Sequence, residues 1–393
     1  MQELRRQDIQ SFIKKHEKED PVSLVLSASK FPSLPIQLIA AQIKSRQKAI
    51  TKLPSLYKIP DVIFPHGVSM EQCSSEATAR YKAQLVEERD SLTDLSGGFG
   101  IDTYFFSQRV KKTIHVEKNP ELSQLALSNY KALNAEITCI HNSAENYLKN
   151  EKTAAKVYYI DPARRDENNK KVFALSDCQP DLTKILPEIE KRNAKLIVKL
   201  SPMLDIEQAM NQLNSVNEIH TVSVDNECKE LLFIITKEPR PVTFHTINLL
   251  KNGGTQLFLF SKKEEEEVPS FSMPSNYLYE PNASIMKAGG FNSISNKLGL
   301  TKLHRNSHLY SSPEIIPNFP GRSFKILKQI ALNKKKLKAE IPSMKANLTV
   351  RNYPQDVSNI RKKTGLKEGG QLYIFATTLM DGTNTGILCE KIN

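Results

Sequence analysis

The residues best suited to chemistry lie around a glycine-rich turn at 97–100. The turn follows a short apolar run at 92–95 and precedes residues 101–110, whose apolar positions recur at helical spacing. Glycine allows positive φ angles and lets a ligand approach the backbone closely. A second predicted strand, 113–117, ends in Glu117, where Rossmann-like βαβ units bind the hydroxyls of a ribose. The spacing therefore predicts a site for a cofactor that contains adenosine.

Two classes of adenosine cofactor share this layout, and the residues on either side of the glycines distinguish them. Dinucleotide folds use G-x-G-x-x-G, in which the third glycine packs the helix against the strand. Here Gly98 and Gly100 have no third partner, and Asp94 precedes them at a spacing that suits the amino group of a methionine moiety. The pattern acid-x-x-x-Gly-x-Gly resembles motif I of the class I S-adenosylmethionine-dependent methyltransferases. The resemblance implies that S-adenosylmethionine is bound by Asp94, Gly98, Gly100 and Glu117.

The resemblance continues along the next predicted strands. Strand 136–140 precedes Asn142 and Ser143, which the family would place near the adenine. Strand 156–160 leads into Asp161-Pro162-Ala163-Arg164, which resembles motif IV, the loop that holds the methyl acceptor. Enzymes that methylate nucleobase amines have a second proline and an aromatic residue where this chain has alanine and arginine. A guanidinium plane can stack on a base or bind a phosphate. The resemblance thus implies an acceptor site at Asp161, Pro162 and Arg164 and leaves the acceptor atom open, a guanine exocyclic amine being one candidate.

Functions besides base methylation stay open. Ribose 2′-O-methyltransferases use a lysine and an acid at the ends of strands four and five, where this chain has Lys199 and Asp161. That class also needs a second lysine and a glutamate, for which Lys82 and Glu230 are only loose candidates, so base methylation is favoured. The same residues are compatible with a small-molecule or protein methyltransferase and with a non-catalytic RNA-binding protein.

The helices and strands expected around these residues indicate an α/β fold. We expect a Rossmann-like, seven-stranded class I methyltransferase core over 66–237, preceded by an N-terminal helical domain over 1–65. Helices are expected at 7–16, 21–28 and 35–53. Just before the first strand, Ser74 to Thr78 either line the cofactor or cap a helix. The isolated histidines His66, His115 and His141 are expected to be structural.

The rest of the chain predicts α+β structure. Residues 238–318 are expected to form a small ferredoxin-like domain that contains a hairpin of strands 242–250 and 255–260, joined at Asn252-Gly253-Gly254. Residues 319–393 are expected to form a basic THUMP-like domain. With the core, this tail resembles that of bacterial methyltransferases with a C-terminal THUMP-like domain. The resemblance implies RNA binding, because THUMP modules are RNA-binding elements of tRNA-modifying enzymes.

The charge distribution points to the same partner. The net charge is +12, and residues 321–393 hold 14 Lys or Arg against 5 Asp or Glu, while residues 1–60 hold 11 against 5. Basic ends around a near-neutral core favour a polyanion. On a methyltransferase this predicts structured RNA, either tRNA or rRNA, held by the N- and C-terminal domains. Candidate phosphate contacts are the basic patches 351–354 and 361–365.

Composition argues against membrane, secreted and metal-binding proteins. No apolar run approaches the ~20 residues of a membrane helix, and the polar start lacks a signal-like segment, so we expect a cytoplasmic protein without membrane contact. The five cysteines have no paired spacing, which predicts reduced thiols and no metal site. The sequence does not indicate the oligomeric state.

Overall fold

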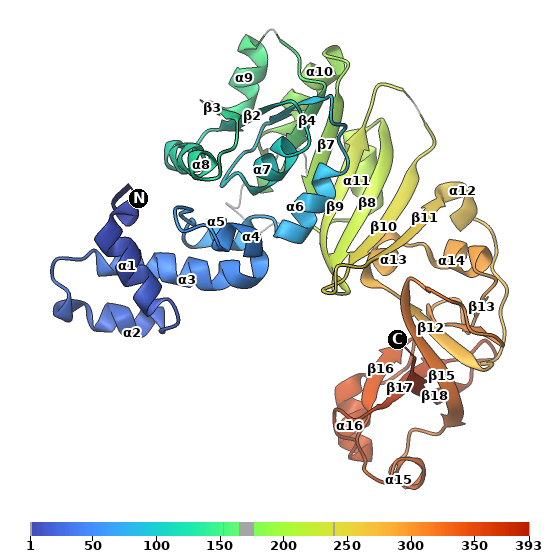
Figure 1. The fold of residues 1–393 in the computed structure, drawn as a ribbon. Helices are drawn as coiled ribbons and strands as arrows, with labels where there is room; N and C mark the ends of the chain where they lie inside the picture. The colour runs from blue at the N-terminus through green and yellow to red at the C-terminus, as the bar shows by residue number, and fades with distance from the viewer. Residues whose placement is uncertain (1, 152, 165–176, 239, 393) are drawn as a thin grey trace. The chain divides into compact units, whose positions relative to one another are not determined.

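A computed structural model describes residues 2–151, 153–164, 177–238 and 240–392 (Figure 1). The chain divides into two compact units. The first unit holds residues 1–217 and 232–239, and the second holds residues 218–231 and 240–393. Among the described helices, none is long and apolar enough to cross a membrane.

The first unit begins with helices, at the three segments where the sequence predicts them. Asp20 caps α2 by accepting hydrogen bonds from the backbone N–H groups of Val22 and Ser23, and Pro21 occupies the first helical position, where no N–H is needed. The bounds are η1 (Gln2–Arg5), α1 (Gln7–His16), α2 (Pro21–Leu26), η2 (Ala28–Lys30), α3 (Ile36–Lys52) and α4 (Pro54–Tyr57).

These helices share one hydrophobic cluster with the sheet that follows. Ile39 and Ile43 of α3 belong to the same buried cluster as Leu92, Phe105 and Tyr159. Because burial of apolar surface is the main favourable term in folding, the helices and the sheet stabilise one another.

The sheet of the first unit is parallel through its first five strands. These are β1 (Ser91–Asp94), β2 (Lys112–Glu117), β3 (Ile137–His141), β4 (Val157–Ile160) and β7 (Lys195–Leu200). All four side chains of β4 are buried, as expected for a strand covered on both faces. Before β1 come α5 (Val68–Gln72) and α6 (Glu76–Ala83). The helices between the strands are α7 (Ile101–Ser107), α8 (Pro120–Ala132), α9 (Ala144–Asn150) and α10 (Leu182–Lys191), and α11 (Ile206–Leu213) follows β7. The carboxyl ends of parallel strands meet at one edge, and the predicted cofactor residues follow these ends.

The full strand order is β11-β10-β8-β9-β7-β4-β1-β2-β3. The next strands along the chain are β8 (Val216–Val224) and β9 (Glu227–Ile235), which are neighbours in this order. Two further strands, β10 (Thr243–Leu249) and β11 (Thr255–Ser261), extend the sheet to nine. They are the hairpin that the sequence analysis assigned to the ferredoxin-like segment. β10 pairs in parallel with β8 along its whole length, so this hairpin covers a sheet edge that would otherwise expose unpaired backbone groups.

A second, seven-stranded sheet belongs to the second unit, in the order β13-β14-β12-β15-β18-β17-β16. Its strands are β12 (Tyr277–Pro281), β13 (Thr301–Lys302), β14 (Tyr310–Ser312), β15 (Gly321–Ile330), β16 (Asn347–Arg351), β17 (Leu372–Thr378) and β18 (Asn384–Lys391). The helices of this unit are α12 (Lys262–Glu265), α13 (Ala283–Ala288), α14 (Phe291–Lys297), α15 (Lys334–Glu340) and α16 (Val357–Thr364). Because β12 pairs with β15, hydrogen bonds of one sheet cross the expected boundary between residues 318 and 319.

Candidate functional site

The glycine turn lies between β1 and α7, where the sequence predicts it. Gly98 has a φ of +54°, and Gly100 has a φ of +88° as the residue before α7. Both values favour glycine over residues with a side chain. A Cβ atom on Gly97 would lie 2.2 Å from Cε1 of His115, and one on Gly100 would lie 2.1 Å from the Tyr130 hydroxyl. At Gly98 the corresponding space is open, with no atom nearer than the Ser96 carbonyl oxygen at 3.7 Å.

Glu117, at the end of β2, contacts this turn directly. One carboxylate oxygen accepts a hydrogen bond of 2.7 Å from the Gly98 N–H, and the other accepts one of 2.7 Å from the Asn119 N–H. A carboxylate has about four acceptor positions, so two remain for the hydroxyls of a ribose. The structure therefore brings Gly98 and Glu117 together at the edge where the strands end.

Asp94 lies buried beneath the turn. Its side chain accepts hydrogen bonds from the Thr103 hydroxyl at 2.6 Å and from the Ser96 N–H at 3.0 Å. Burial raises the pKa of Asp94 to about 7, although both hydrogen bonds act in the opposite direction. This carboxyl group therefore changes its charge near neutral pH.

His115 also contacts Thr103 and lies under the turn. Its Nδ1 is 2.9 Å from the Tyr130 hydroxyl and 3.3 Å from that of Thr103. Burial lowers the pKa of His115 to about 4. The neutral ring packs against Gly97, which agrees with the structural role expected for this histidine.

The two residues expected near the adenine follow β3. The Asn142 N–H donates to the Glu117 carbonyl oxygen at 3.1 Å, so Asn142 lies beside the predicted ribose carboxylate. The Ser143 hydroxyl caps α9 by accepting from the Asn146 N–H at 3.2 Å. Ser143 thus has a structural task besides any contact with a ligand.

Asp161 follows β4 and is joined to the turn through Ser96. The Asp161 N–H donates to the Ser96 hydroxyl at 2.6 Å, and that hydroxyl donates to Asp94 at 3.3 Å. The Asp161 carboxylate forms an ion pair with Lys199 of β7. Asp161 keeps 36% of its side chain exposed against 12% for Lys199, so the carboxylate is the more accessible partner.

The rest of the predicted acceptor loop is described in part. Pro162 follows Asp161 and is half-buried, and Ala163–Arg164 forms β5, which pairs with β6 (Cys178–Gln179). The side chain of Arg164 and residues 165–176 lie outside the described part of the chain.

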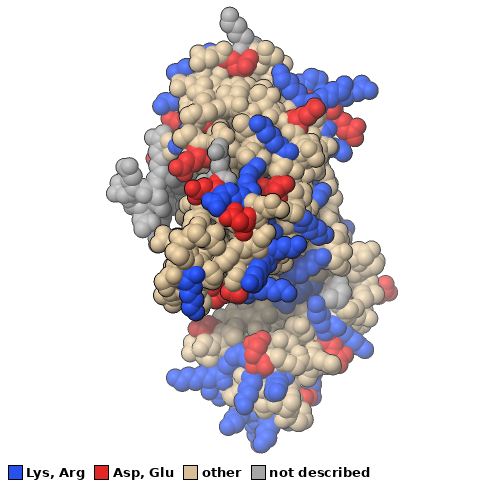
Figure 2. Space-filling model, turned by 60° about the vertical axis from the view of Figure 1, so that its left-hand side comes forward, with Lys and Arg blue, Asp and Glu red and all other residues tan. Residues whose placement is uncertain are grey.

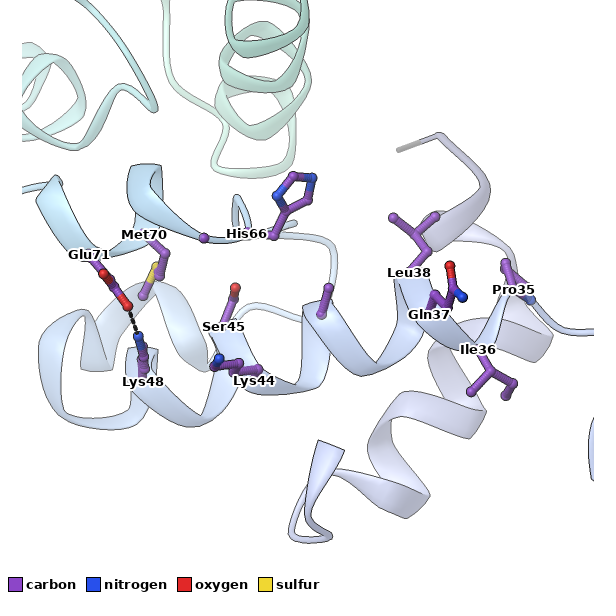
Figure 3. Close-up of a pocket in the computed structure, with 12 residues that line it drawn as sticks. Pro35, Ile36, Gln37, Leu38, Lys44, Ser45, Lys48, His66, Met70 and Glu71 are labelled. Atoms are coloured by element: carbon purple, nitrogen blue, oxygen red, sulfur yellow. Dashed lines mark hydrogen bonds and ion pairs between the residues drawn. The ribbon is translucent and has the colours of Figure 1, made fainter. Parts of the chain in front are cut away.

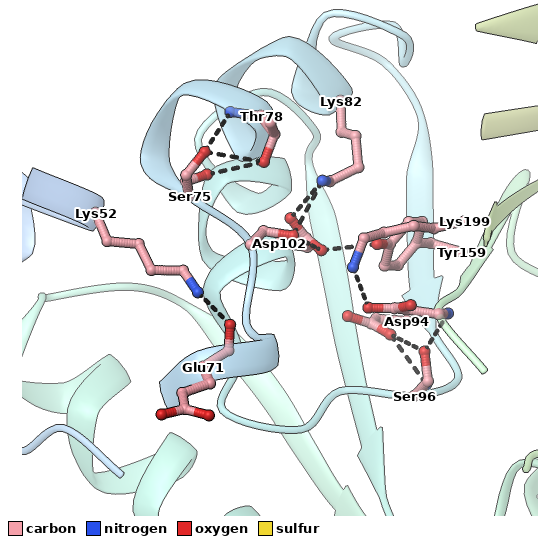
Figure 4. A network of polar contacts seen from close by, with 12 residues as sticks. Lys52, Glu71, Ser75, Thr78, Lys82, Asp94, Ser96, Asp102, Tyr159 and Lys199 are labelled. Carbon is pink, nitrogen blue, oxygen red and sulfur yellow. Dashed lines mark hydrogen bonds and ion pairs between the residues drawn. The ribbon is translucent and has the colours of Figure 1, made fainter. Parts of the chain in front are cut away.

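A buried network beside the turn was missed from the sequence (Figure 4). Lys82 of α6 is completely buried and forms an ion pair of 3.2 Å with Asp102 of α7. Asp102 also accepts from the Ser74 hydroxyl at 2.8 Å and the Tyr159 hydroxyl at 2.7 Å. Burial alone would raise the pKa of Asp102, but Lys82 and Lys199 lower it below its ordinary value. The sequence held one signal for this network, which is Asp102, an acid in the first helical turn after the glycines.

The segment before β1 contributes to a helix cap and to this network. Ser75 caps α6 by accepting from the Thr78 N–H, so these two residues act as an ordinary helix cap. Ser74, in contrast, lies next to Asp102 and Lys82 in the network. Lys82 is paired with Asp102, which counts against the role in ribose methylation considered for it.

A cavity of about 730 Å³ lies elsewhere in the first unit, between α3 and α5 (Figure 3). Its lining includes Lys44, Lys48 and His66, and Lys48 forms an ion pair of 2.6 Å with Glu71. None of the predicted cofactor residues lines this cavity.

Lysine and arginine side chains gather on the C-terminal part of the second unit. Figure 2 shows them crowded in the lowest part of the view, where α15 and α16 are found in Figure 1. Lys334, Lys335 and Lys336 begin α15 and are exposed, and Lys362 and Lys363 lie in the last turn of α16. The basic stretch expected from the sequence therefore faces solvent.

Comparisons with known proteins agree with the fold of the second unit. Residues 277–320 match a family model described as a ferredoxin-like domain, and residues 321–391 match one described as THUMP domain-like. No curated protein matches the chain.

The chain is similar over almost its whole length to one solved structure. That protein, from Porphyromonas gingivalis W83 and described as a "putative methyltransferase", is 31% identical and superimposes with a TM-score of 0.88 over 98% of each chain. TrmK of M. capricolum, solved with S-adenosylhomocysteine, is 13% identical with a TM-score of 0.32 over 41% of this chain and 68% of its own. Similarity as low as the latter says nothing about what this chain binds.

Proposed function

The chain belongs to the class I S-adenosylmethionine-dependent methyltransferases with a C-terminal THUMP-like domain, and on that premise we propose that it methylates structured RNA. The observation that carries the proposal is the meeting of two sites at one sheet edge. The glycine turn, bonded to Glu117, lies beside the Asp161–Lys199 pair, and Ser96 joins the two. A cofactor at the turn would thus adjoin an acceptor at Asp161.

We propose that Asp94, Gly98 and Glu117 hold S-adenosylmethionine. Three features fit this cofactor: the open space at Gly98, the acceptor positions left on Glu117 and a buried carboxyl at Asp94 that can pair with an ammonium group. Gly100 shapes the turn, and Asn142 and Ser143 would lie near the adenine. When bound, the cofactor supplies a methyl group on a positively charged sulfur.

Asp161 is proposed to hold the methyl acceptor. Its carboxylate can accept a hydrogen bond from an amino group, and the ion pair with Lys199 fixes its position. Such positioning is the main requirement of an in-line transfer, because a correctly held acceptor needs little other catalysis. Pro162 is proposed to restrict the backbone next to Asp161, and Arg164 is proposed to stack on a base or bind a phosphate.

RNA is the proposed partner because of the family match and the charge of the same segment. The THUMP-like residues 321–391 coincide with the basic C-terminal part, and the lysines of α15 are exposed. The N-terminal helices, which are also basic, are proposed to contribute. A guanine exocyclic amine in tRNA or rRNA is the acceptor we favour, in a cytoplasmic enzyme.

A ribose 2′-hydroxyl is the second candidate acceptor, favoured by the Asp161–Lys199 pair itself. Two observations weigh against it. Lys82, the candidate second lysine, is buried and paired with Asp102. Moreover, an ion pair with Asp161 stabilises the protonated form of Lys199, which a general base would have to lose.

Nucleoside mass spectrometry tests the proposal. Total RNA from cells with and without this gene is digested and compared, and we expect one methylated base to disappear and to return with the wild-type gene. Return with the Asp161→Ala variant at full level would remove Asp161 from the mechanism. An unchanged nucleoside profile in tRNA and rRNA would reject RNA as the substrate, and loss of a 2′-O-methylated nucleoside would select the second candidate.

A further inference from the structure

Two histidines and a carboxylate meet on β8 and β10 in the second unit. These strands are parallel neighbours, and their register pairs His220 with His245 and Glu218 with Thr243. Side chains two residues apart on a strand point to the same face, so Glu218 and His220 project together and His245 joins them from the next strand. The sheet thus unites groups that are distant in sequence.

The distances within this cluster are short. Nε2 of His220 lies 3.1 Å from Oε2 of Glu218, and Nε2 of His245 lies 3.8 Å from the same oxygen. One possible ligand atom from each residue falls within 4.8 Å of the other two. The side chain of His220 is 3% exposed, against 24% for His245 and 41% for Glu218. The cluster therefore has a buried anchor and a side that an ion in solution can reach.

The donor set suits a particular class of cation. Imidazole nitrogens with one carboxylate oxygen bind Zn²⁺ and neighbouring first-row transition metals, whereas Mg²⁺ and Ca²⁺ prefer oxygen donors. A histidine must be neutral to bind a metal. Two imidazoles and one carboxylate therefore favour a transition-metal ion over Mg²⁺ or Ca²⁺.

The orientation of the rings sets one condition for binding. The two imidazoles are stacked, with 4.2 Å between centroids and 10° between planes. A metal ion lies near the plane of each imidazole that binds it, so two stacked rings cannot both be ligands until one of them turns. His245 is the more exposed ring, and rotation about its Cβ–Cγ bond needs the least repacking.

We propose that Glu218, His220 and His245 bind one divalent transition-metal ion, which would connect β8 with β10. Three protein ligands leave a fourth tetrahedral position for water. None of the three belongs to the residues proposed for methyl transfer. The expectation of no metal rested on cysteine spacing, which carries no information about ligands that come from two paired strands.

Calorimetric titration of Zn²⁺ into the full chain, without an affinity tag and after treatment with a chelator, tests this proposal. We expect one ion per chain and a higher melting temperature with Zn²⁺ than without it. His245→Gln and, separately, Glu218→Gln should each weaken binding at least ~10-fold, whereas His141→Gln, which alters an exposed histidine of β3, should leave it unchanged. Both test positions are partly exposed, so these variants are expected to fold.

Cobalt distinguishes this site from the cysteines. Co²⁺ bound by nitrogen and oxygen gives visible absorption without the thiolate charge-transfer band that cysteine ligands produce. Absence of stoichiometric binding, a thiolate band, or wild-type affinity in His245→Gln would each overturn the proposal. Methyl transfer is measured separately, so failure of the metal site and failure of the proposed function remain distinguishable.

Discussion

Gly97, Gly98 and Gly100 are glycines for different physical reasons, although they form one motif in the sequence. Gly97 must be small because the His115 ring occupies the place of its Cβ, and Gly100 because Tyr130 does. At Gly98 the requirement is a positive φ angle and an open approach to the backbone. Only Gly98 therefore has the features of a position that faces a ligand.

Alanine at Gly98 and at Gly100 should consequently have different effects. The left-handed conformation costs roughly 1–2 kcal/mol at either position, and Gly100→Ala adds the collision with Tyr130, a further ~1–3 kcal/mol. We expect Gly100→Ala to lower the melting temperature strongly. Gly98→Ala should remain folded and lose affinity for S-adenosylhomocysteine, measured by calorimetry. Equal affinity in Gly98→Ala and the wild type would show that the cofactor does not lie over this residue.

Replacement of Asp161 should lower the rate of methyl transfer much more than it lowers affinity for the cofactor. Removal of the hydrogen-bond acceptor in Asp161→Ala should lower kcat on RNA by ~10²-fold or more, because the methyl acceptor loses the group that positions it. Affinity of the variant for S-adenosylhomocysteine should stay within about twofold of the wild-type affinity, a difference of ~0.4 kcal/mol. Asp381→Ala, in an exposed turn, is the matched control and should keep full activity. A loss of cofactor affinity that equals the loss of rate would instead make Asp161 part of the cofactor site.

Asp94 should make cofactor affinity depend on pH. With a pKa of about 7 its carboxyl is mainly protonated below neutrality, whereas an ammonium partner favours the ionised form. Affinity for S-adenosylhomocysteine should therefore rise with pH, by up to ~10-fold per unit below 7, and level off above it. Asp94→Asn should bind more weakly and lose this slope. An unchanged slope in that variant would assign the titration to another group.

At the scale of elements, α6 and α7 are joined by one buried ion pair. Lys82 and Asp102 come from different helices, and their charges balance each other where the helices meet. Breaking a buried pair leaves an uncompensated charge, whereas removing both charges is often tolerated.

Lys82→Met should accordingly destabilise the protein by roughly 3–5 kcal/mol. The double variant Lys82→Met/Asp102→Asn should recover most of that loss, as measured by denaturant unfolding. Arg6→Ala removes an exposed ion pair with Asp8 and should cost at most ~1 kcal/mol. If the double variant is as unstable as the single one, the hydrogen bonds to Ser74 and Tyr159 matter more than charge.

Elements with a local signal could be predicted from the sequence, and long-range partners could not. The turn at 97–100, the strand that ends at Glu117 and the helix at 7–16 each follow from residues close in the chain. The pairing of Lys82 with Asp102 depends on how two helices pack. The hairpin of β10 and β11 was recognised, but its place beside β8 depends on which sheet edge remained uncovered.

At the scale of the whole molecule, RNA binding should depend strongly on salt. Each phosphate contact adds about 0.7–0.9 to the slope of log K against log salt concentration. Replacement of Lys334, Lys335 and Lys336 by alanine should weaken binding of bulk tRNA and reduce that slope. Lys262→Ala/Lys263→Ala, next to four glutamates, is the control and should leave the slope unchanged. A slope unaffected by the α15 variant would move the RNA site away from this helix.

Domain limits were harder to predict than domain content. The family models match residues 277–320 and 321–391, whereas the sequence analysis expected the ferredoxin-like part at 238–318 and the THUMP-like part at 319–393. Composition changes near residue 320, yet β12 and β15 pair across that point. Backbone hydrogen bonds between strands depend little on side-chain type, so composition alone does not reveal them.

The shared contact of Asp94 and His115 with Thr103 has a consequence for acid tolerance. Folding raises the pKa of Asp94 from 3.8 to about 7 and lowers that of His115 from 6.5 to about 4. Between about pH 4 and 6.5 the folded state holds one proton more at Asp94 and one fewer at His115 than the unfolded state does. The extra proton on Asp94 makes stability fall as pH rises. The missing proton on His115 makes stability fall as pH drops, so the two effects nearly cancel. The contributions of Asp94 and His115 to the pH dependence of stability therefore offset each other. Replacement of either residue alone would make the stability of the protein depend on pH in this range.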